Sequence, residues 1–107
     1  MSYEINFYDE IGSDPIVKFI KKCDHGLQAK ILKELDLLEN YGLKIGMPHL
    51  KKITKDLYEL RVLGKVNIRL IFTYKKENFY ILHIFKKKSN KTPIRELNVA
   101  INRLTNI

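Results

Sequence analysis

Three segments of alternating side chains follow one another between residues 57 and 87, and they constrain the fold more than any other feature. They cover residues 57–62, 66–75 and 79–87, and only the short connections "LGK" and "KEN" separate them. Strands joined this closely usually pair as antiparallel hairpins. The centre of the chain therefore predicts a small antiparallel β-sheet.

Helical patterns precede this sheet in the sequence. After a short strand over residues 3–8, Asp14-Pro15 supplies an N-cap and a proline suited to the first turn of a short helix. Asp24 is expected to cap a longer helix that Gly42 ends. Its apolar positions are spaced by three or four, as on one face of a helix: Leu27, Ile31, Leu35 and Leu38. Together the two helices predict an αα-hairpin.

A second helical pattern follows the sheet. Residues 43–56 are expected to form a loop, and Thr92-Pro93 repeats the cap-and-proline signal of a helix start. The apolar stripe of this closing helix comprises Ile94, Leu97, Ile101 and Leu104. The predicted order is β-α-α-β-β-β-α, an α+β fold with the helical hairpin and the closing helix on one face of the sheet.

Length and composition place this fold in one domain. A chain of 107 residues is long enough for one hydrophobic core, so residues 1–107 are expected to form a single domain. No stretch approaches the roughly 20 apolar residues that a membrane span needs. The acidic start "MSYEINFYDE" does not resemble a signal peptide, and the lone Cys23 is compatible with a reducing cytoplasm. One cysteine and three scattered histidines argue against a structural zinc site.

The charge is unevenly distributed along the chain. Residues 1–50 hold 6 Lys and 8 Asp or Glu, a balance of −2, whereas residues 51–107 hold 14 Lys or Arg and 4 Asp or Glu, a balance of +10. Such a split favours a polyanion or an acidic partner bound by the C-terminal half. A basic surface that serves only solubility is the simpler alternative.

Side-chain alternation predicts two different faces for the sheet. Even-numbered positions of the three strands are apolar throughout and are expected to face the helices, whereas odd-numbered positions are mixed and carry the polar residues among apolar ones. With three-residue loops, Arg61 pairs with Asn67 and Glu59 pairs with Arg69. At the second hairpin the same rule pairs Lys75 with Phe79, Asn67 with Lys87 and Arg69 with Phe85.

These pairings bring distant residues to one patch on the open face. Arg61, Arg69 and Lys87 are expected to lie within a few ångströms of one another, with Glu59 as the neighbouring acid. Guanidinium and ammonium groups in this arrangement suit a phosphate and can stabilise charge that develops on it. A Glu59–Arg69 pair with the other cations simply solvated is the alternative, and it explains Arg69 but leaves Arg61 and Lys87 without an acid.

The motifs "LYELRV", "IRLIF" and "ILHIFKKKSNKTP", in this order before a helix, resemble those of the RelE/ParE toxin superfamily, in particular its HigB-like, phage-related branch. This resemblance implies a RelE-like fold and a cytoplasmic toxin of a type II toxin–antitoxin system. The implied partner is a cognate antitoxin with a helix-turn-helix DNA-binding domain. The implied activity is cleavage of mRNA in the ribosomal A site, with neither a metal nor another cofactor. The ribose 2′-hydroxyl would attack the adjacent phosphate, leaving a cyclic phosphate and a 5′-hydroxyl.

The resemblance also implies roles for individual residues. Arg61 matches the arginine of the "ELR" motif, Arg69 the arginine at the start of the next strand, and Lys87 the basic residue that ends the last strand. Basic residues that would grip RNA follow from the same match: Lys51, Lys52, Lys86 and Lys88. Glu59 stands where some relatives carry a lysine.

Several residues are candidates for the general base, and several activities are compatible with the sequence. Glu59, His83, His49 and a lysine whose pKa the neighbouring cations lower each have suitable chemistry for the base. The same scaffold also hosts ParE-like inhibitors of DNA gyrase that cut nothing. A non-catalytic RNA-binding protein is the third candidate, and it predicts binding that falls steeply with salt.

Overall fold

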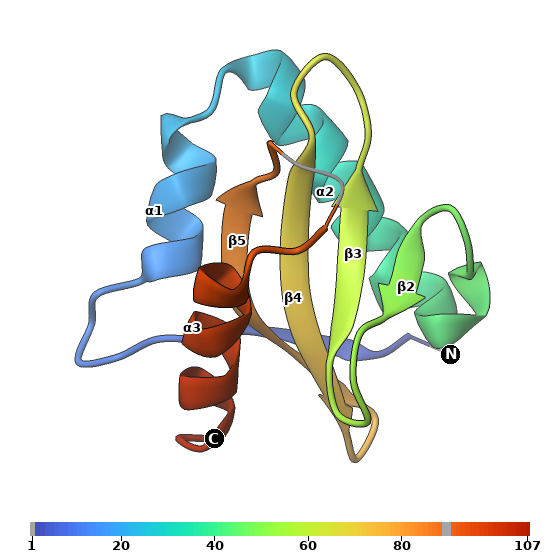
Figure 1. The fold of residues 1–107 in the computed structure, drawn as a ribbon. Coiled ribbons are helices and arrows are strands. Elements are labelled where there is room, and N and C mark those ends of the chain that lie inside the picture. The colour runs from blue at the N-terminus through green and yellow to red at the C-terminus, as the bar shows by residue number, and fades with distance from the viewer. Residues whose placement is uncertain (1, 89–90) are drawn as a thin grey trace.

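A computed structural model describes residues 2–88 and 91–107 and shows a five-stranded sheet with three α-helices (Figure 1). The strand order is β1-β5-β4-β3-β2, in which β1 runs parallel to β5 and the other neighbours are antiparallel. The strands are β1 (Glu4–Phe7), β2 (Leu50–Lys52), β3 (Tyr58–Val62), β4 (Ile68–Lys75) and β5 (Asn78–Lys86). The predicted α+β fold is confirmed.

The segment predicted as a loop over residues 43–56 contains regular structure. A 3₁₀-helix covers Gly42–Ile45, and β2 then pairs with β3, with Lys51 opposite Glu59. The strand was missed because it has only three residues, and two of them are exposed lysines. This pairing places Lys51 beside the polar face of β3.

The helices α1 (Pro15–Lys22) and α2 (His25–Tyr41) form the expected hairpin. Asp24 caps α2 as predicted, since its Oδ1 accepts a hydrogen bond from the backbone N–H of Leu27 at 2.8 Å. Asp14 occupies the N-cap position of α1 and Pro15 its first turn, as predicted, but the Asp14 side chain makes no capping hydrogen bond. Its backbone is left-handed, and its own N–H donates to Oδ1 of Asp9 at 2.8 Å.

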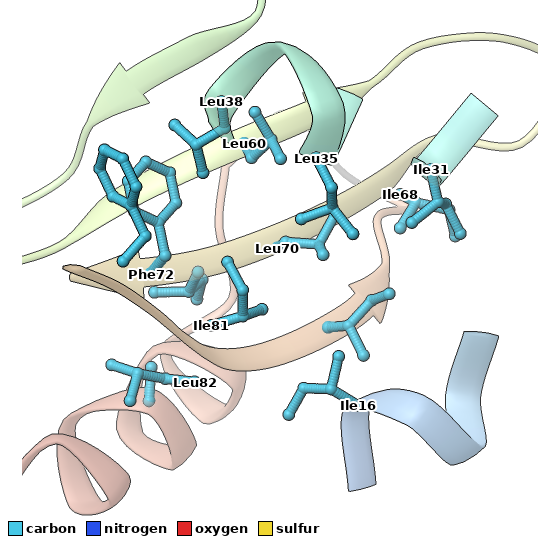
Figure 2. Packing of buried hydrophobic residues seen from close by; sticks show 14 of the residues in the cluster. Ile16, Ile31, Leu35, Leu38, Leu60, Ile68, Leu70, Phe72, Ile81 and Leu82 are labelled. Atoms are coloured by element: carbon cyan, nitrogen blue, oxygen red, sulfur yellow. The ribbon is translucent and has the colours of Figure 1, made fainter. Parts of the chain in front are cut away.

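The main core lies between the helical hairpin and one face of the sheet. Figure 2 shows Leu35 and Leu38 of α2 packed over Leu60 and Leu70 of β3 and β4. All four side chains are buried. The even-numbered residues of β3 and β4 therefore face the hairpin, as their alternation predicts.

Helix α3 (Ile94–Leu104) packs against the opposite face of the sheet, which corrects the prediction that all helices share one face (Figure 1). Leu82 of β5 and Ala100 of α3 are fully buried on this side. The helix is rotated relative to the predicted stripe, because Ile94 and Ile101 are exposed whereas Leu97 and Leu104 pack against the core. Helix α3 thus covers part of the polar face along β5 and β4, and this places the start of α3 beside the rest of it.

A bulge in β5 decides which apolar residues of this strand lie on the second face. Ile71 pairs with His83 but Phe72 pairs with Ile81, so β5 has one extra residue and its alternation reverses. Phe79 and Ile81 then face the hairpin, and Leu82 faces α3. Lys75 pairs with Asn78 through a two-residue turn whose residues both have positive φ, which corrects the three-residue loop and the Lys75–Phe79 pair.

In the part of the chain that the structure describes, no helix has the length and apolar character needed to cross a membrane.

Candidate active site

A pocket of about 230 Å³ lies beside the polar face of the sheet, between β2, β3, the end of β5 and the segment that leads into α3. Its lining residues are Lys51, Lys52, Ile53, Glu59, Arg61, Lys87, Lys91 and Thr92. Five of these eight are Lys or Arg and one is acidic. A concave surface with this balance attracts an anion.

The pairing of β3 with β4 places two arginines directly opposite each other. Arg61 lies opposite Arg69 and Glu59 opposite Ile71, which corrects the predicted Arg61–Asn67 and Glu59–Arg69 pairs by two residues. The faces stay as predicted because a shift by two residues keeps the alternation. The connection between the strands is accordingly longer than three residues. Like charges in direct cross-strand pairs are unfavourable, so this register needs a compensating acid.

Glu59 is that acid. Its carboxylate Oε1 lies 3.3 Å from Nε of Arg69, 3.5 Å from Nε of Arg61 and 3.9 Å from Nζ of Lys87. The glutamate is 1% exposed, so water screens these attractions little. One carboxylate oxygen therefore holds all three of the cations that the sequence predicted would meet.

The other oxygen of Glu59 has a partner that the sequence analysis missed. Thr92 donates its hydroxyl to Oε2 at 2.6 Å, across 33 positions of the sequence. The expected role of Thr92 was to cap α3, but the N-cap position belongs to Pro93 and has no side-chain hydrogen bond. The motif "KTP" gave no signal for this contact, because a local capping pattern does not reveal a distant acceptor.

Lys87 reaches the pocket from the strand end. Its backbone N–H donates to the Asn67 carbonyl at 2.8 Å, in agreement with the predicted Asn67–Lys87 pairing, and its side chain is 8% exposed. Burial lowers the pKa of the Lys87 ammonium, and the charges of Arg69, Arg61 and Lys51 lower it further, against the opposing effect of Glu59. A lysine with a lowered pKa releases its proton more readily than an exposed one.

Arg69 is buried beneath the pocket. It lies opposite Phe85 as predicted and is 6% exposed, and it is absent from the pocket lining. Its Nη1 donates to the Ile68 carbonyl at 3.2 Å, whereas its Nε faces Glu59 without the alignment of a hydrogen bond. Burial lowers the pKa of Arg69, with Glu59 opposing the shift. Arg69 is therefore placed to hold Glu59, whereas Arg61 and Lys87 are placed to contact a ligand in the pocket.

The remaining predicted basic residues divide into two pairs. Lys51 and Lys52 line the pocket from β2, and Nζ of Lys52 lies 5.8 Å from the centre of the Tyr58 ring. Lys86 and Lys88 are exposed and lie outside the pocket lining. Only the first pair is therefore placed to contact an anion in the pocket.

The two histidines suggested as bases are engaged elsewhere. Nε2 of His83 lies 2.7 Å from a Glu96 carboxylate oxygen, and Arg103 approaches its Nδ1 at 3.4 Å, so α3 occupies both ring nitrogens. Burial lowers the pKa of His83, against Glu96. His49 pairs through Nδ1 with Glu34 of α2 at 2.8 Å, and its side chain does not line the pocket. These contacts favour structural roles for both histidines.

No group of three or more His, Cys, Asp or Glu side chains suited to a metal ion occurs in residues 2–88 and 91–107. The pocket instead offers one guanidinium and several ammonium groups around a single buried carboxylate. This arrangement has the chemistry that suits an oxyanion such as a phosphate and the negative charge on it.

Solved structures define the class of fold. The YoeB dimer from Staphylococcus aureus has a similar chain, with 20% identity and a TM-score of 0.57 over 83% of this chain and 100% of that one. A chain of the RelE–RelB complex from Pyrococcus horikoshii OT3 matches with 19% identity and a TM-score of 0.55, over 85% and 100% of the two chains. At these identities the likeness establishes a RelE- and YoeB-like fold.

The family follows from the sequence. Residues 18–105 match the family described as phage-derived protein Gp49-like (DUF891), and the chain therefore belongs to this family. A comparison with curated proteins gives no match.

Proposed function

We propose that this protein is the toxin of a type II toxin–antitoxin system and acts as a metal-independent endoribonuclease on mRNA in the ribosomal A site. The observation that carries the proposal is the pocket in which Arg61 and Lys87 share the buried carboxylate of Glu59. Three cations meet one acid there, so a net positive charge is left for a phosphate. The RelE- and YoeB-like fold supports the same class.

In this proposal the pocket binds the phosphate that is cut. The ribose 2′-oxygen loses its proton and forms a bond to phosphorus, and the bond to the 5′-oxygen breaks. The 5′-oxygen takes a proton from solvent water, which leaves a cyclic phosphate and a 5′-hydroxyl. Arg61 binds the phosphate oxygens and stabilises their growing charge, while Glu59 and Arg69 keep it oriented from below. Lys51 and Lys52 contact the neighbouring RNA backbone from β2.

Lys87 is the candidate for the proton transfer. The lowered pKa increases the fraction of neutral amine near neutral pH, and only that form accepts the 2′-proton. The substitution Lys87→Arg tests this assignment, because the arginine side chain keeps a positive charge but stays protonated and therefore does not act as a base. Lys87→Arg is expected to lose cleavage as fully as Lys87→Met while still binding RNA. An active Lys87→Arg variant would assign Lys87 a purely electrostatic role.

The proposed partner is a cognate antitoxin of the helix-turn-helix kind, as in the HigB-like branch of the superfamily. Structural neighbours support an antitoxin in general, since the related chains include a heterotetrameric YoeB–YefM toxin–antitoxin complex from Staphylococcus aureus, with 18% identity and a TM-score of 0.57. A net charge of +8 also favours an acidic segment in whatever covers the pocket.

The test is expression in cells followed by mapping of RNA 5′-ends on a translated and an untranslated transcript. Arg61→Gln removes a pocket cation, and Arg95→Gln removes a matched arginine that is 85% exposed on α3. We expect in-frame cuts on the translated message with wild type and Arg95→Gln, and none with Arg61→Gln. A folded Arg61→Gln protein, checked by circular dichroism, excludes unfolding as the cause.

Other outcomes would refute the nuclease. If cells stop growing with intact mRNA, and Arg61→Gln does not relieve the growth arrest, the protein would instead be an inhibitor of DNA gyrase. A supercoiling assay then tests that activity. RNA binding without cuts, weakened equally by each lost cation and by salt, would indicate a non-catalytic RNA-binding protein.

A further inference from the structure

The segment between β5 and α3 brings to the pocket a hydroxyl side chain that no motif assigned to the site. Thr92 lines the pocket, and its hydroxyl donates to Oε2 of Glu59 at 2.6 Å. A hydroxyl donor to a carboxylate at this distance makes a charge-assisted hydrogen bond, which is stronger than a neutral one. Its partner is 1% exposed, so water is poorly placed to replace the donor.

This bond controls how the Glu59 carboxylate is turned. The opposite oxygen, Oε1, is within 3.3–3.9 Å of Arg69, Arg61 and Lys87. Since a carboxylate is planar and rigid, fixing Oε2 also fixes where Oε1 stands among the three cations. Without the hydroxyl, partial rotation about the last side-chain bond of Glu59 would displace Oε1 from this position, and that torsion is a soft one.

Thr92 is itself held by the anchoring of α3. The next residue, Pro93, restricts the backbone at the N-cap of the helix. Further along α3, Glu96 contacts Nε2 of His83 at 2.7 Å, and Arg103 donates to the Leu82 carbonyl at 2.8 Å. The helix thus ties Thr92 to β5 while the hydroxyl reaches the carboxylate on β3.

We propose that Thr92 is a positioning residue, which orients Glu59 through its hydroxyl and thereby sets Arg61 and Lys87 in the geometry that the cleavage step needs. This role rests on the proposed nuclease function. Thr92 itself takes no part in proton transfer, so its effect falls on the rate of cleavage at saturation and leaves RNA affinity nearly unchanged.

The experiment compares Thr92→Val with Thr92→Ser. Valine keeps the shape of threonine without the donor, and serine keeps the donor without the methyl group. Single-turnover cleavage is measured on purified ribosomes programmed with an mRNA whose cut site has been mapped in cells. Affinity is measured on the same complex with a 2′-deoxy nucleotide at that site, which cannot be cut. Urea unfolding reports the stability of each protein.

We expect Thr92→Val to slow cleavage at saturation about tenfold or more, the size typical of a lost hydrogen bond to a charged group. Affinity for the 2′-deoxy message should change less than about twofold, and Thr92→Ser should restore most of the rate, because both follow from the hydroxyl alone. A merely structural role would lower stability for both variants without this pattern.

Three results would overturn the proposal. The first is cleavage by Thr92→Val at the wild-type rate, and the second is a Thr92→Ser variant as slow as Thr92→Val. The third is a loss that lies wholly in affinity. Each of these leaves the nuclease function intact as long as wild type cuts and Arg61→Gln does not. Wild-type protein that leaves the programmed message whole would instead refute the proposed function, and the role of Thr92 in it would fall with it.

Discussion

Replacing Glu59 with glutamine removes the negative charge that holds Arg61, Arg69 and Lys87 together. The side chain keeps its size, and the amide oxygen still accepts a hydrogen bond from Thr92. The change therefore removes the charge, and it also places an amide NH2, a donor, where Oε1 faced the three cations. It leaves three cations near one point, two of them directly opposite each other on β3 and β4.

The burial of this cluster sets the expected magnitude. The side chains of Glu59, Arg69 and Lys87 are 2%, 8% and 8% exposed, and that of Arg61 is 19% exposed. Removal of one partner from a buried ion pair costs about 3–5 kcal/mol, whereas an exposed pair contributes at most ~1 kcal/mol. We expect Glu59→Gln to lower the free energy of unfolding by about 3 kcal/mol. For a domain of this size that corresponds to a fall in Tm of roughly 12–24 °C.

Urea unfolding followed by circular dichroism measures this loss, with Glu10→Gln, an exposed acid, as the matched control. Arg69→Met should cost less than Glu59→Gln, because Glu59 keeps two cations when Arg69 is lost. The double variant should lose less than the sum of the two, since the second change removes a charge that the first left unpaired. Millimolar phosphate should recover part of the stability of Glu59→Gln by binding the freed cations. A loss below about 1 kcal/mol would refute the reasoning, because that is the value for solvated surface pairs.

Two further predictions concern α2 and α3. Gly42 ends α2 at φ 63°, and a Cβ there would stand 2.6 Å from the ring of Tyr3, so Gly42→Ala should lower the free energy of unfolding by about 1–3 kcal/mol in urea. His83 has a pKa below its ordinary 6.5 because it is buried between Glu96 and Arg103 of α3. The unfolded chain then binds more protons below pH 6.5, so stability should fall on acidification from pH 6.5 to the folded pKa, and the urea midpoint of His83→Gln should fall less over that range.

The sequence predicts the faces of β3 and β4 well, for a simple physical reason. Leu60 and Ile68 alternate with polar neighbours, and burying one face fixes which side chains point inward. The convergence of Arg61, Arg69 and Lys87 on Glu59 follows from that alternation. Their convergence was predictable even though the predicted Arg61–Asn67 and Glu59–Arg69 pairings were wrong.

Hydrophobic alternation does not predict the bulge in β5 or the position of α3. Phe79, Ile81 and Leu82 are all apolar, so alternation does not reveal that the extra residue in β5 divides them between two faces. Without the bulge Phe79 and Ile81 would lie on the polar side of the sheet, and with it Leu82 lies there instead. Helix α3 covers this apolar area, and the segment that leads into the helix brings Thr92 to the pocket.

The register between β3 and β4 depends on charge, because the hydrophobic alternation allows more than one pairing. Pairing Arg61 with Asn67 or with Arg69 buries the same apolar face, so the hydrophobic pattern does not distinguish the two. An electrostatic argument that considers one cross-strand pair at a time predicts that Arg61 opposite Arg69 is unfavourable. The observed register is acceptable because Oε1 of Glu59 reaches both guanidinium groups from one position along β3. Sequence reasoning that treats cross-strand pairs singly therefore fails at a site like this one, where a single buried carboxylate compensates several cations at once.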